Sequence, residues 1–436
     1  MGDTQRSQTV STRLQVIAEQ ARKHPEMIFT SLIHLIDIDF LREAYKQTRK
    51  DGAKGVDHVS GRDYGDDLEE NLKSLHSRLR QQRYKAMPVR RAWIEKEDGS
   101  QRPLGIPAFE DKIVQRAVSM LMSAIYEQDF YGFSHGFRKE HSAHQAIKEL
   151  REKCVALNIN WIVDADVSKF FDNLDHGLLL EIIRKRINDG GIVRLIGKWL
   201  NAGVLEEGKL IYAEQGTPQG GVISPLLANI FLHHVLDKWL ENEIRPRLKG
   251  RCFLIRYADD FVVGVELESD ARRFMAVLPK RFNRFKLTIH PEKTKLVRFH
   301  PLQAGEKAGV ECRTFDFLGF THYWAQSLSG RWIIKRKTAA KRLRRAMKSV
   351  WQWCRDHRHW NMMEQYRILS AKLYGHYQYY AIRANFKMLE VYYEHVEDCW
   401  RRWLGQRSRN GYISGKEYDQ IRKRYPLPAP RIIHCI

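Results

Sequence analysis

The sequence predicts an α+β fold in which short apolar strands end in acidic residues. Residues 253–265 form two apolar runs, rich in β-branched and aromatic side chains, on either side of Asp259 and Asp260. This pattern is typical of a β-hairpin with two carboxylates at its tip. A second apolar run, residues 161–172, also becomes acidic toward its end. Apolar residues at helical spacing over 111–126 predict an amphipathic helix, so both element types are expected.

Carboxylates at the ends of rigid strands are the usual means of holding Mg²⁺. This ion prefers oxygen ligands, takes one or two protein carboxylates, and completes its shell with water and substrate phosphates. Two such ions about 4 Å apart can activate an attacking hydroxyl and stabilise the leaving oxygen of a nucleotidyl transfer. An isolated Asp-Asp pair is equally typical of a tight turn, because Asp is common in turns. The two acidic stretches together favour the metal site.

Composition narrows the class of partner. A chain of 436 residues is too long for one small core and fits two or three subdomains. Its formal net charge of +22 indicates a polyanionic partner, most simply nucleic acid. The apolar runs are shorter than the ~20 residues of a membrane-spanning helix, and the N-terminus has no apolar signal core. We therefore expect a cytoplasmic protein with no membrane partner.

Three ordered motifs give a specific resemblance. The segment around Asp166, the Gly-rich stretch of residues 215–226 (QGTPQGGVISPL) and residues 257–260 (YADD) resemble the reverse-transcriptase motifs of bacterial group II intron proteins. The resemblance extends over nearly the whole chain. It implies RNA-templated DNA synthesis by a right-hand polymerase. The implied regions are an N-terminal extension and fingers (1–155), a palm with an antiparallel sheet and the catalytic carboxylates (156–325), and a helical thumb or maturase domain (326–436).

The same resemblance implies the catalytic residues. Asp166, Asp259 and Asp260 match the family's catalytic carboxylates. Two Mg²⁺ ions are expected to bind to these three residues and to Val167. Asp164 and Asp166 would share one strand face, because side chains alternate along a strand. The family motif favours Asp166 of the two as the metal ligand.

Residues for the incoming nucleotide are implied in the fingers and the palm. Lys96 and Arg102, on a hairpin predicted over residues 84–107, match the residues that hold the triphosphate. A solvated edge strand protected by cations is the alternative for this hairpin. Phe171 matches the aromatic ring beneath the sugar, which would collide with a ribose 2′-hydroxyl, and core packing is a compatible role. Gln219 would lie near the nascent base pair, in a Gly-rich turn that allows close backbone approach to a ligand.

Lys293 lies in the family's next motif and would help to neutralise the triphosphate, with a solvated lysine as the alternative. The chain departs from the family pattern at two turns. Lys139-Glu140 stands where the family usually has Pro-Gly, and Lys286 replaces a usual glycine. The departure at Lys139-Glu140 leaves the geometry of that turn open, and the catalytic assignment does not depend on it.

The composition shifts at about Arg331 to a region loaded with Trp, Tyr, Arg and Lys. Residues 335–337 (KRK) and 341–345 (KRLRR) open this region, which we expect to be helical and to resemble the thumb. Basic residues interleaved with aromatic rings suit a surface that follows a nucleic-acid backbone. We expect that surface on one face and, on the opposite face, a core that includes Trp351, Leu373, Tyr377 and Trp400.

The expected partners are an RNA template, intron RNA, a DNA primer or target, and dNTPs, whereas the oligomeric state is left open. Two alternatives also stay open: a splicing cofactor that binds RNA and makes little use of its polymerase, and a domesticated reverse transcriptase in defence or repair. The last residues show no His-Asn-His or paired-Cys pattern, so we expect no endonuclease domain. Intron RNA domains in the flanking genome would distinguish these alternatives.

Overall fold

The computed structural model describes the chain except for residues 1–8, 96–100, 207–208, 212–219, 302–312 and 409–410. The chain divides into two compact units. The first unit contains residues 1–146 and 163–296, and the second contains residues 147–162 and 297–436. Helices and strands occur in both units, which confirms the predicted α+β class.

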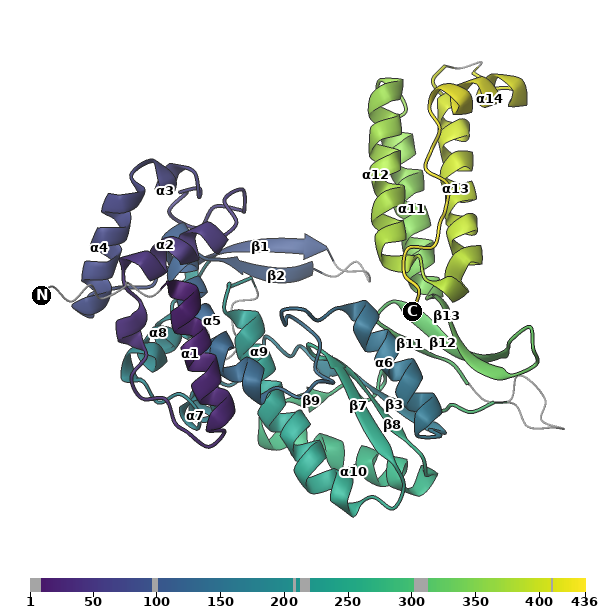
Figure 1. The fold of residues 1–436 in the computed structure, drawn as a ribbon. Helices are drawn as coiled ribbons and strands as arrows, with labels where there is room; N and C mark the ends of the chain where they lie inside the picture. The colour runs from purple at the N-terminus through teal and green to yellow at the C-terminus, as the bar shows by residue number, and fades with distance from the viewer. Residues whose placement is uncertain (1–8, 96–100, 207–208, 212–219, 302–312, 409–410) are drawn as a thin grey trace, which may run out of the picture. The chain divides into compact units, whose positions relative to one another are not determined.

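Several helices of the first unit pack around α5 (Phe109–Asp129), which contains the helix predicted over 111–126 and is buried on most of its sides. α1 (Val10–Lys23) and α2 (Ile38–Gln47) pack along α5 (Figure 1). The remaining helices are α3 (Asp63–Asp66), α4 (Leu68–Arg80), α7 (His176–Arg184), α8 (Gly190–Leu200), α9 (Ser224–Leu232) and α10 (Glu268–Arg284). The short 3-10 and π segments are η1 (Ile33–Leu35), η2 (His233–Asp237), η3 (Leu240–Ile244) and η4 (Arg245–Arg247).

A four-stranded sheet extends from these helices, and its strand order is β2-β1-β5-β6. The strands are β1 (Val89–Glu95), β2 (Gln101–Ile106), β5 (Val204–Glu206) and β6 (Lys209–Ile211). β1 and β2 pair antiparallel, with Ile94 opposite Arg102, so the hairpin predicted over 84–107 is confirmed. Figure 1 shows the β1–β2 hairpin reaching beyond the helices of this unit.

A second four-stranded sheet has the order β10-β3-β8-β7. Its strands are β3 (Trp161–Ala165), β7 (Cys252–Tyr257), β8 (Asp260–Val265) and β10 (Lys295–Arg298). Beside it, β4 (Val167–Ser168) pairs antiparallel with β9 (Thr288–Ile289). α10 packs against β8, where the rings of Phe261 and Phe282 stack with their centroids 6.1 Å apart. The predicted strands of 161–172 and 253–265 are therefore neighbours in one sheet.

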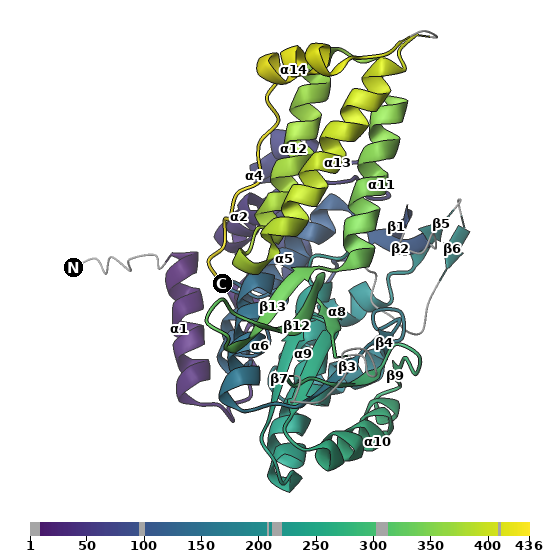
Figure 2. The same cartoon turned by 90° about the vertical axis from the view of Figure 1, so that its right-hand side faces the viewer.

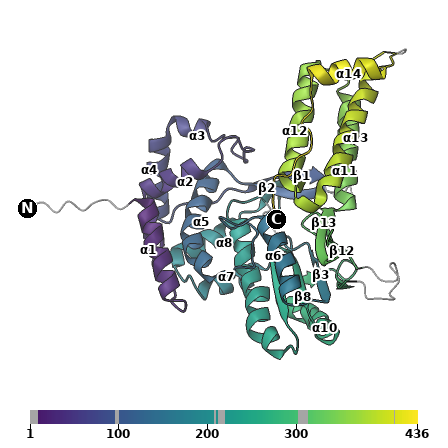
Figure 3. The ribbon, with the colours of Figure 1, turned by 45° about the vertical axis from the view of Figure 1, so that its right-hand side comes forward.

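In the second unit, a three-stranded sheet leads into a helical bundle. Its elements are β11 (Phe315–Phe317), β12 (Phe320–Gln326), β13 (Trp332–Thr338), α11 (Ala340–Asp356), α12 (Met362–Tyr380), η5 (Arg383–Asn385), α13 (Phe386–Gly405) and α14 (Gly415–Arg424), and α6 (Ala143–Ala156) enters this unit at residue 147. Figures 2 and 3 show α11, α12 and α13 side by side with α14 across their tips.

The bundle core contains most of the residues predicted for it. Leu373, Tyr377 and Trp400 are buried, whereas Trp351 is partly buried and packs against the core with its ring at 5.2 Å from that of Trp403. On α11, Leu343, Val350 and Cys354 face this core. The cations of the same helix lie exposed: Lys341, Arg342, Arg344, Arg345, Lys348 and Arg355. The predicted division of this region into an apolar face and a basic face is therefore confirmed for α11.

The prediction for residues 335–337 was partly wrong, because these cations lie on strand β13 and not on a helix. Side chains alternate along a strand, so Arg336 points away from the face shared by Lys335 and Lys337. Arg336 is 2% exposed, and its Nη2 atom donates to the main-chain oxygen of Ile436 at 2.7 Å. Lys337 is exposed and lies over the Tyr323 ring at 5.3 Å. Only the two lysines are therefore available to a phosphate.

The two departures from the family pattern both fall at left-handed backbone positions. Glu140 has φ = +64° and Lys286 has φ = +59°. Glycine reaches this region without steric cost, which explains why a glycine is usual there. The Lys286 ammonium gains an ion pair with Asp175 at 2.6 Å, and Asp175 also caps α7 through the Leu178 amide. The chain thus keeps the turn geometry at both sites without the glycine.

Candidate active site

The hairpin predicted around Asp259 and Asp260 is confirmed as β7 and β8. The two strands pair antiparallel from Cys252 opposite Val265 to Tyr257 opposite Asp260, which leaves a two-residue turn of Ala258 and Asp259. The apolar residues of both strands are buried. The tip of the hairpin is therefore carried on a rigid and buried element.

Four carboxylates gather where β3 ends and β8 begins. Asp164 lies in β3, Asp166 follows it, Asp259 lies in the turn and Asp260 is the first residue of β8. Asp260 is exposed at the surface, yet surrounding protein atoms displace much of the water that would solvate its carboxylate. This desolvation, together with the charges of Asp164, Asp259 and Asp166, raises the pKa of Asp260 to about 8. The acids are therefore close enough to repel one another.

A hollow of about 400 Å³ lies beside these acids. Its lining comes from β2, from the segment after β3, from the hairpin turn and from the segment after β9. The lining residues are Pro103, Asp166, Val167, Ser168, Lys169, Phe170, Phe171, Asp172, Asp259, His290 and Lys293. The structure thus brings together Asp166, Val167, Phe171, Asp259 and Lys293 of the residues predicted from the sequence.

Pairing of β4 with β9 places the segment that carries Lys293 opposite Asp166. Val167 lies opposite Ile289, and the His290 amide donates to the Asp166 carbonyl at 2.8 Å. Lys293 Nζ then lies 3.0 Å from Asp166 Oδ2. Both side chains of this ion pair are largely exposed. An exposed pair of this kind contributes roughly 0 to 1 kcal/mol, so it can open at little cost.

Phe171 forms part of the wall of the hollow. Its ring packs edge-on against Phe170, with the centroids 5.2 Å apart, and Phe170 itself is buried. Phe171 is only partly buried. The ring is therefore supported from behind by the core while one side of it borders the hollow, an arrangement that allows both roles considered for it.

For three of the predicted nucleotide-binding residues, the side chains lie outside the described part of the chain. Lys96 and Gln219 lie outside the described residues, and Arg102 is described only through its backbone in β2. Pro103, the next residue of that strand, lines the hollow. The strand that carries Arg102 therefore passes beside the site.

The Gly-rich turn was predicted to allow close backbone approach to a ligand. At Gly220 the turn instead approaches the backbone of another segment of the same chain. Gly220 has φ = +122°, and a Cβ atom built on it would lie 2.8 Å from the carbonyl oxygen of Gly105 in β2. The Val222 amide donates to Gln115 Oε1 at 2.8 Å. Glycine is thus required where the turn crosses β2, and α5 holds the end of the turn.

Sequence reasoning missed two residues of the site. Asp164 was set aside in favour of Asp166. Its charge nevertheless raises the pKa of Asp260 more than the charge of Asp259 or Asp166 does. His290 was not singled out, although it lines the hollow and its buried Nδ1 has no hydrogen-bond partner among the described residues. The position of His290 opposite Asp166 depends on strand pairing between distant segments, which no local pattern indicates.

The donor set at the hollow fits a hard divalent cation. It consists of carboxylate oxygens whose mutual repulsion a cation would relieve. Within the described part of the chain, no three carboxylate, imidazole or thiol groups are close enough to enclose an ion by themselves. Mg²⁺ does not require such a cage, because it keeps several waters and binds through one or two carboxylates plus substrate phosphates. The residues therefore suit an open site that the substrate completes.

A hairpin with two acids at its tip, beside a strand that is followed by a third acid, forms within this α+β fold a site suited to two-metal nucleotidyl transfer. Comparison with known families then gives the particular family. Residues 94–322 match the family described as "Reverse transcriptase (RNA-dependent DNA polymerase)". Since the match covers more than half of the 436 residues, the chain belongs to the reverse transcriptase family. Members of this family generally use divalent metal ions, and an RNA template is implied as a partner.

Individual relatives support the same family. The chain is 34% identical to Protein YkfC of Escherichia coli (strain K12) over 326 residues, which cover 66% of this chain and 84% of YkfC. It is 30% identical to the group II intron-encoded protein LtrA of Lactococcus lactis subsp. cremoris over 360 residues, which cover 69% of this chain and 59% of LtrA. It is 33% identical to the putative COX1/OXI3 intron 2 protein of Saccharomyces cerevisiae over 240 residues, which cover 53% and 27% of the two chains. The resemblance to intron-encoded reverse transcriptases and maturases is thereby confirmed.

Among the described residues, no helix is long and apolar enough to cross a membrane.

The raised pKa of Asp260 predicts how the metal-free protein responds to pH. The pKa is about 8 in the folded chain and about 4 in the unfolded chain, so unfolding releases a proton between these values. Stability of the wild-type chain should fall accordingly as the pH rises from about 4 to about 8. Asp260→Asn carries no charge. With EDTA present, this variant should unfold at a higher temperature than wild type at pH 8, and the difference should shrink toward pH 4.

Thermal unfolding across this pH range measures the effect. Asp66→Asn, at an exposed carboxylate of α3, is the matched control and should show no such trend. A difference between Asp260→Asn and wild type that stays constant with pH would contradict the raised pKa.

Proposed function

We propose that this chain synthesises DNA on an RNA template with Asp166, Asp259 and Asp260 as its catalytic carboxylates. The supporting observation is the convergence of these acids beside a hollow that also contains Phe171 and Lys293. The hollow is large enough for a nucleotide, and its lining offers acids for metal ions, a cation for phosphate and a ring for the sugar. The proposed partners are a DNA primer or target and dNTPs.

In the proposed reaction, the 3′-hydroxyl of the primer loses its proton to solvent as its oxygen forms a bond to the α-phosphorus of a dNTP. The bond from that phosphorus to the oxygen shared with the β-phosphate breaks, and pyrophosphate leaves. Two Mg²⁺ ions bound at Asp166, Asp259, Asp260 and Val167 would supply the charge that activates the hydroxyl and stabilises the leaving oxygen. Asp260, whose pKa is raised to about 8 in the metal-free chain, would give up its proton on binding a cation.

Lys293 has a role on either side of this step. In the metal-free chain it pairs with Asp166 at 3.0 Å and offsets part of the negative charge. If Asp166 held a metal ion, the Lys293 ammonium at the wall of the hollow would be able to contact the triphosphate as a point charge. Lys96 and Arg102 are proposed for the same triphosphate on the strength of the family pattern.

A second function, binding of intron RNA to assist splicing, is favoured by the basic face of α11. The exposed cations of this helix lie opposite a buried apolar face, so they form a surface and not a scattered set. The similarity to LtrA, an intron-encoded protein, supports the same role. Recruitment of the chain to defence or repair is the alternative, and the genomic flanks distinguish the two by the presence or absence of intron RNA domains.

The polymerase proposal predicts primer extension. With an oligonucleotide annealed to RNA, dNTPs and Mg²⁺, the wild-type chain should extend the primer, and Asp259→Ala should abolish extension because a metal ligand is lost. The variant should remain folded, since removing one of four crowded acids relieves repulsion. Gel analysis of the products measures extension, and Asp66→Ala is the control. A folded wild-type chain that extends no primer on any RNA template would refute the proposal.

The position of Phe171 predicts a change in sugar selection. If its ring lies beneath the sugar, Phe171→Ala should incorporate ribonucleotides more readily relative to deoxynucleotides, because the shorter side chain removes a clash with the 2′-hydroxyl. Single-nucleotide incorporation rates with dNTP and rNTP give the ratio. A variant that polymerises with the wild-type ratio would restrict Phe171 to packing against Phe170.

The alternation on β13 predicts which cations contribute to RNA binding. Each neutralised phosphate gives a log-log salt slope of about −0.7 to −0.9. The double substitution of Lys335 and Lys337 by Ala should therefore flatten the slope by about 1.5 units, while Arg336 contributes nothing because it is buried. Binding of structured RNA across a salt series measures this. The control replaces Lys416 and Lys423 of α14 by Ala, which removes the same charge at another place. If both double variants flattened the salt slope equally, the position of the lysines on β13 would have no part in RNA binding.

A further inference from the structure

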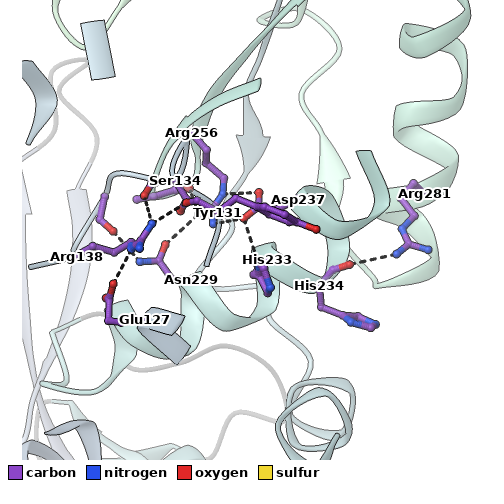
Figure 4. A network of polar contacts seen from close by, with 12 residues as sticks. Glu127, Tyr131, Ser134, Arg138, Asn229, His233, His234, Asp237, Arg256 and Arg281 are labelled. Atoms are coloured by element: carbon purple, nitrogen blue, oxygen red, sulfur yellow. Dashed lines mark hydrogen bonds and ion pairs between the residues drawn. The ribbon is translucent and has the colours of Figure 1, made fainter. Parts of the chain in front are cut away.

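The turn that carries Asp259 rests on a buried arginine three residues before it. Arg256 lies in β7 and is fully buried, as is its partner Asp237 in η2. The guanidinium donates from Nε to Asp237 Oδ1 at 2.8 Å and from Nη2 to Asp237 Oδ2 at 2.6 Å (Figure 4). Burial alone would raise the pKa of Asp237, but the charge of Arg256 keeps that pKa below its ordinary value. The two groups therefore form an ionised bidentate pair in the core.

The remaining arm of the guanidinium reaches the turn. Nη1 of Arg256 donates to the carbonyl oxygen of Ala258 at 3.0 Å and to Asn229 Oδ1 at 2.9 Å. Asn229, a buried residue of α9, in turn donates from Nδ2 to the carbonyl oxygen of Gly136 at 2.7 Å. One side chain thus joins the hairpin turn to α9 and η2.

The same turn is held from its other side by the segment that contains Gly136. A Cβ atom on Gly136 would lie 2.2 Å from the Ala258 nitrogen, so the two backbones are in direct contact. The main chain of Arg256 exchanges hydrogen bonds with this segment, at 2.9 Å to Phe133 and at 2.8 Å from His135. Ala258 itself has φ = +58°, a left-handed position at which a two-residue hairpin usually has glycine. Such a conformation persists only where its surroundings fix it.

We propose that Arg256, held by Asp237 and Asn229, is a positioning residue that fixes the Ala258–Asp259 turn so that Asp259 and Asp260 present their carboxylates to the metal ions. Four acids that repel one another would otherwise drive the turn away from Asp164 and Asp166. A contact to the carbonyl oxygen of Ala258 sets the backbone of the turn and leaves the carboxylates unobstructed. This inference rests on the metal site proposed above and adds the group that shapes it.

Arg256→Lys is the direct test. Lysine retains the charge that Asp237 requires, but it cannot donate from one plane to Asp237, Asn229 and Ala258 together. The variant should fold and bind primer–template as wild type does. The Mg²⁺ concentration for half-maximal extension should rise by about 10- to 100-fold, the range found when groups that orient metal ligands are replaced. Binding of Mn²⁺, measured by electron paramagnetic resonance without turnover, should weaken by a similar factor.

A second variant leaves the ion pair intact. Asn229→Ala removes one acceptor of Arg256 and the contact with Gly136, and it should weaken Mn²⁺ binding by about 3-fold or more. Arg281→Lys is the matched control: Arg281 donates to the carbonyl oxygens of Val235 and His234 next to Asp237 but does not reach the turn (Figure 4). This control should leave both readouts unchanged.

The two proposals fail differently. A wild-type chain without polymerase activity would refute the proposed function, whatever Arg256 does to Mn²⁺ binding. An active wild type, with a folded Arg256→Lys variant whose Mg²⁺ dependence and Mn²⁺ affinity are unchanged, would refute the positioning role alone. If Arg256→Lys does not fold, Asn229→Ala decides, and unchanged Mn²⁺ affinity in that variant would overturn the inference.

Discussion

Repulsion among four carboxylates is the constraint on which the rest of the first unit depends. Asp164, Asp166, Asp259 and Asp260 are near enough to raise the pKa of Asp260 to about 8, so the site opposes folding when no cation is present. Buried apolar side chains on both strands of the hairpin offset this cost. A fully buried Leu, Ile, Val or Phe contributes about 1.5 to 3 kcal/mol, and β7 and β8 each contain several. The buried sheet is therefore what allows the acids to stay together.

The sequence could predict those parts of the site whose interacting residues lie close together along the chain. The β7–β8 hairpin is local: two apolar runs separated by two residues define it, and it was predicted with its acids at the tip. The adjacency of β3 and β8 is not local, and the sequence linked the two acidic stretches only through the carboxylates that a two-metal site requires. Asp164 was set aside because the family motif favoured Asp166, although the alternation of side chains along a strand had placed both acids on one face.

The left-handed turns show a different limit. Glu140 and Lys286 stand where glycine is usual. A pattern of residue types cannot show whether the backbone keeps its left-handed conformation there or changes to one that suits the larger residue. At Lys286 the backbone kept the left-handed conformation, and an ion pair with Asp175 accompanies it. The partner lies 111 residues earlier in the chain, so its contribution could not be read from the turn itself. Tertiary contacts, and not local propensity, decide such positions.

The role of Arg256 is the hardest part of the site to predict from sequence, because Arg256 is only a single charged residue within an apolar run. Its burial next to Asp237 also answers an electrostatic requirement. A cation that touched Asp259 or Asp260 directly would compete with Mg²⁺ for their charge, whereas Arg256 is neutralised by Asp237 and contacts only the backbone of the turn. The pair can therefore fix the geometry of the carboxylates while the negative potential at the hollow stays available to metal ions. A neutral apolar residue at position 256 would also leave the negative potential at the hollow available to metal ions. It could not fix the geometry of the carboxylates, since it has no donor for the Ala258 carbonyl oxygen.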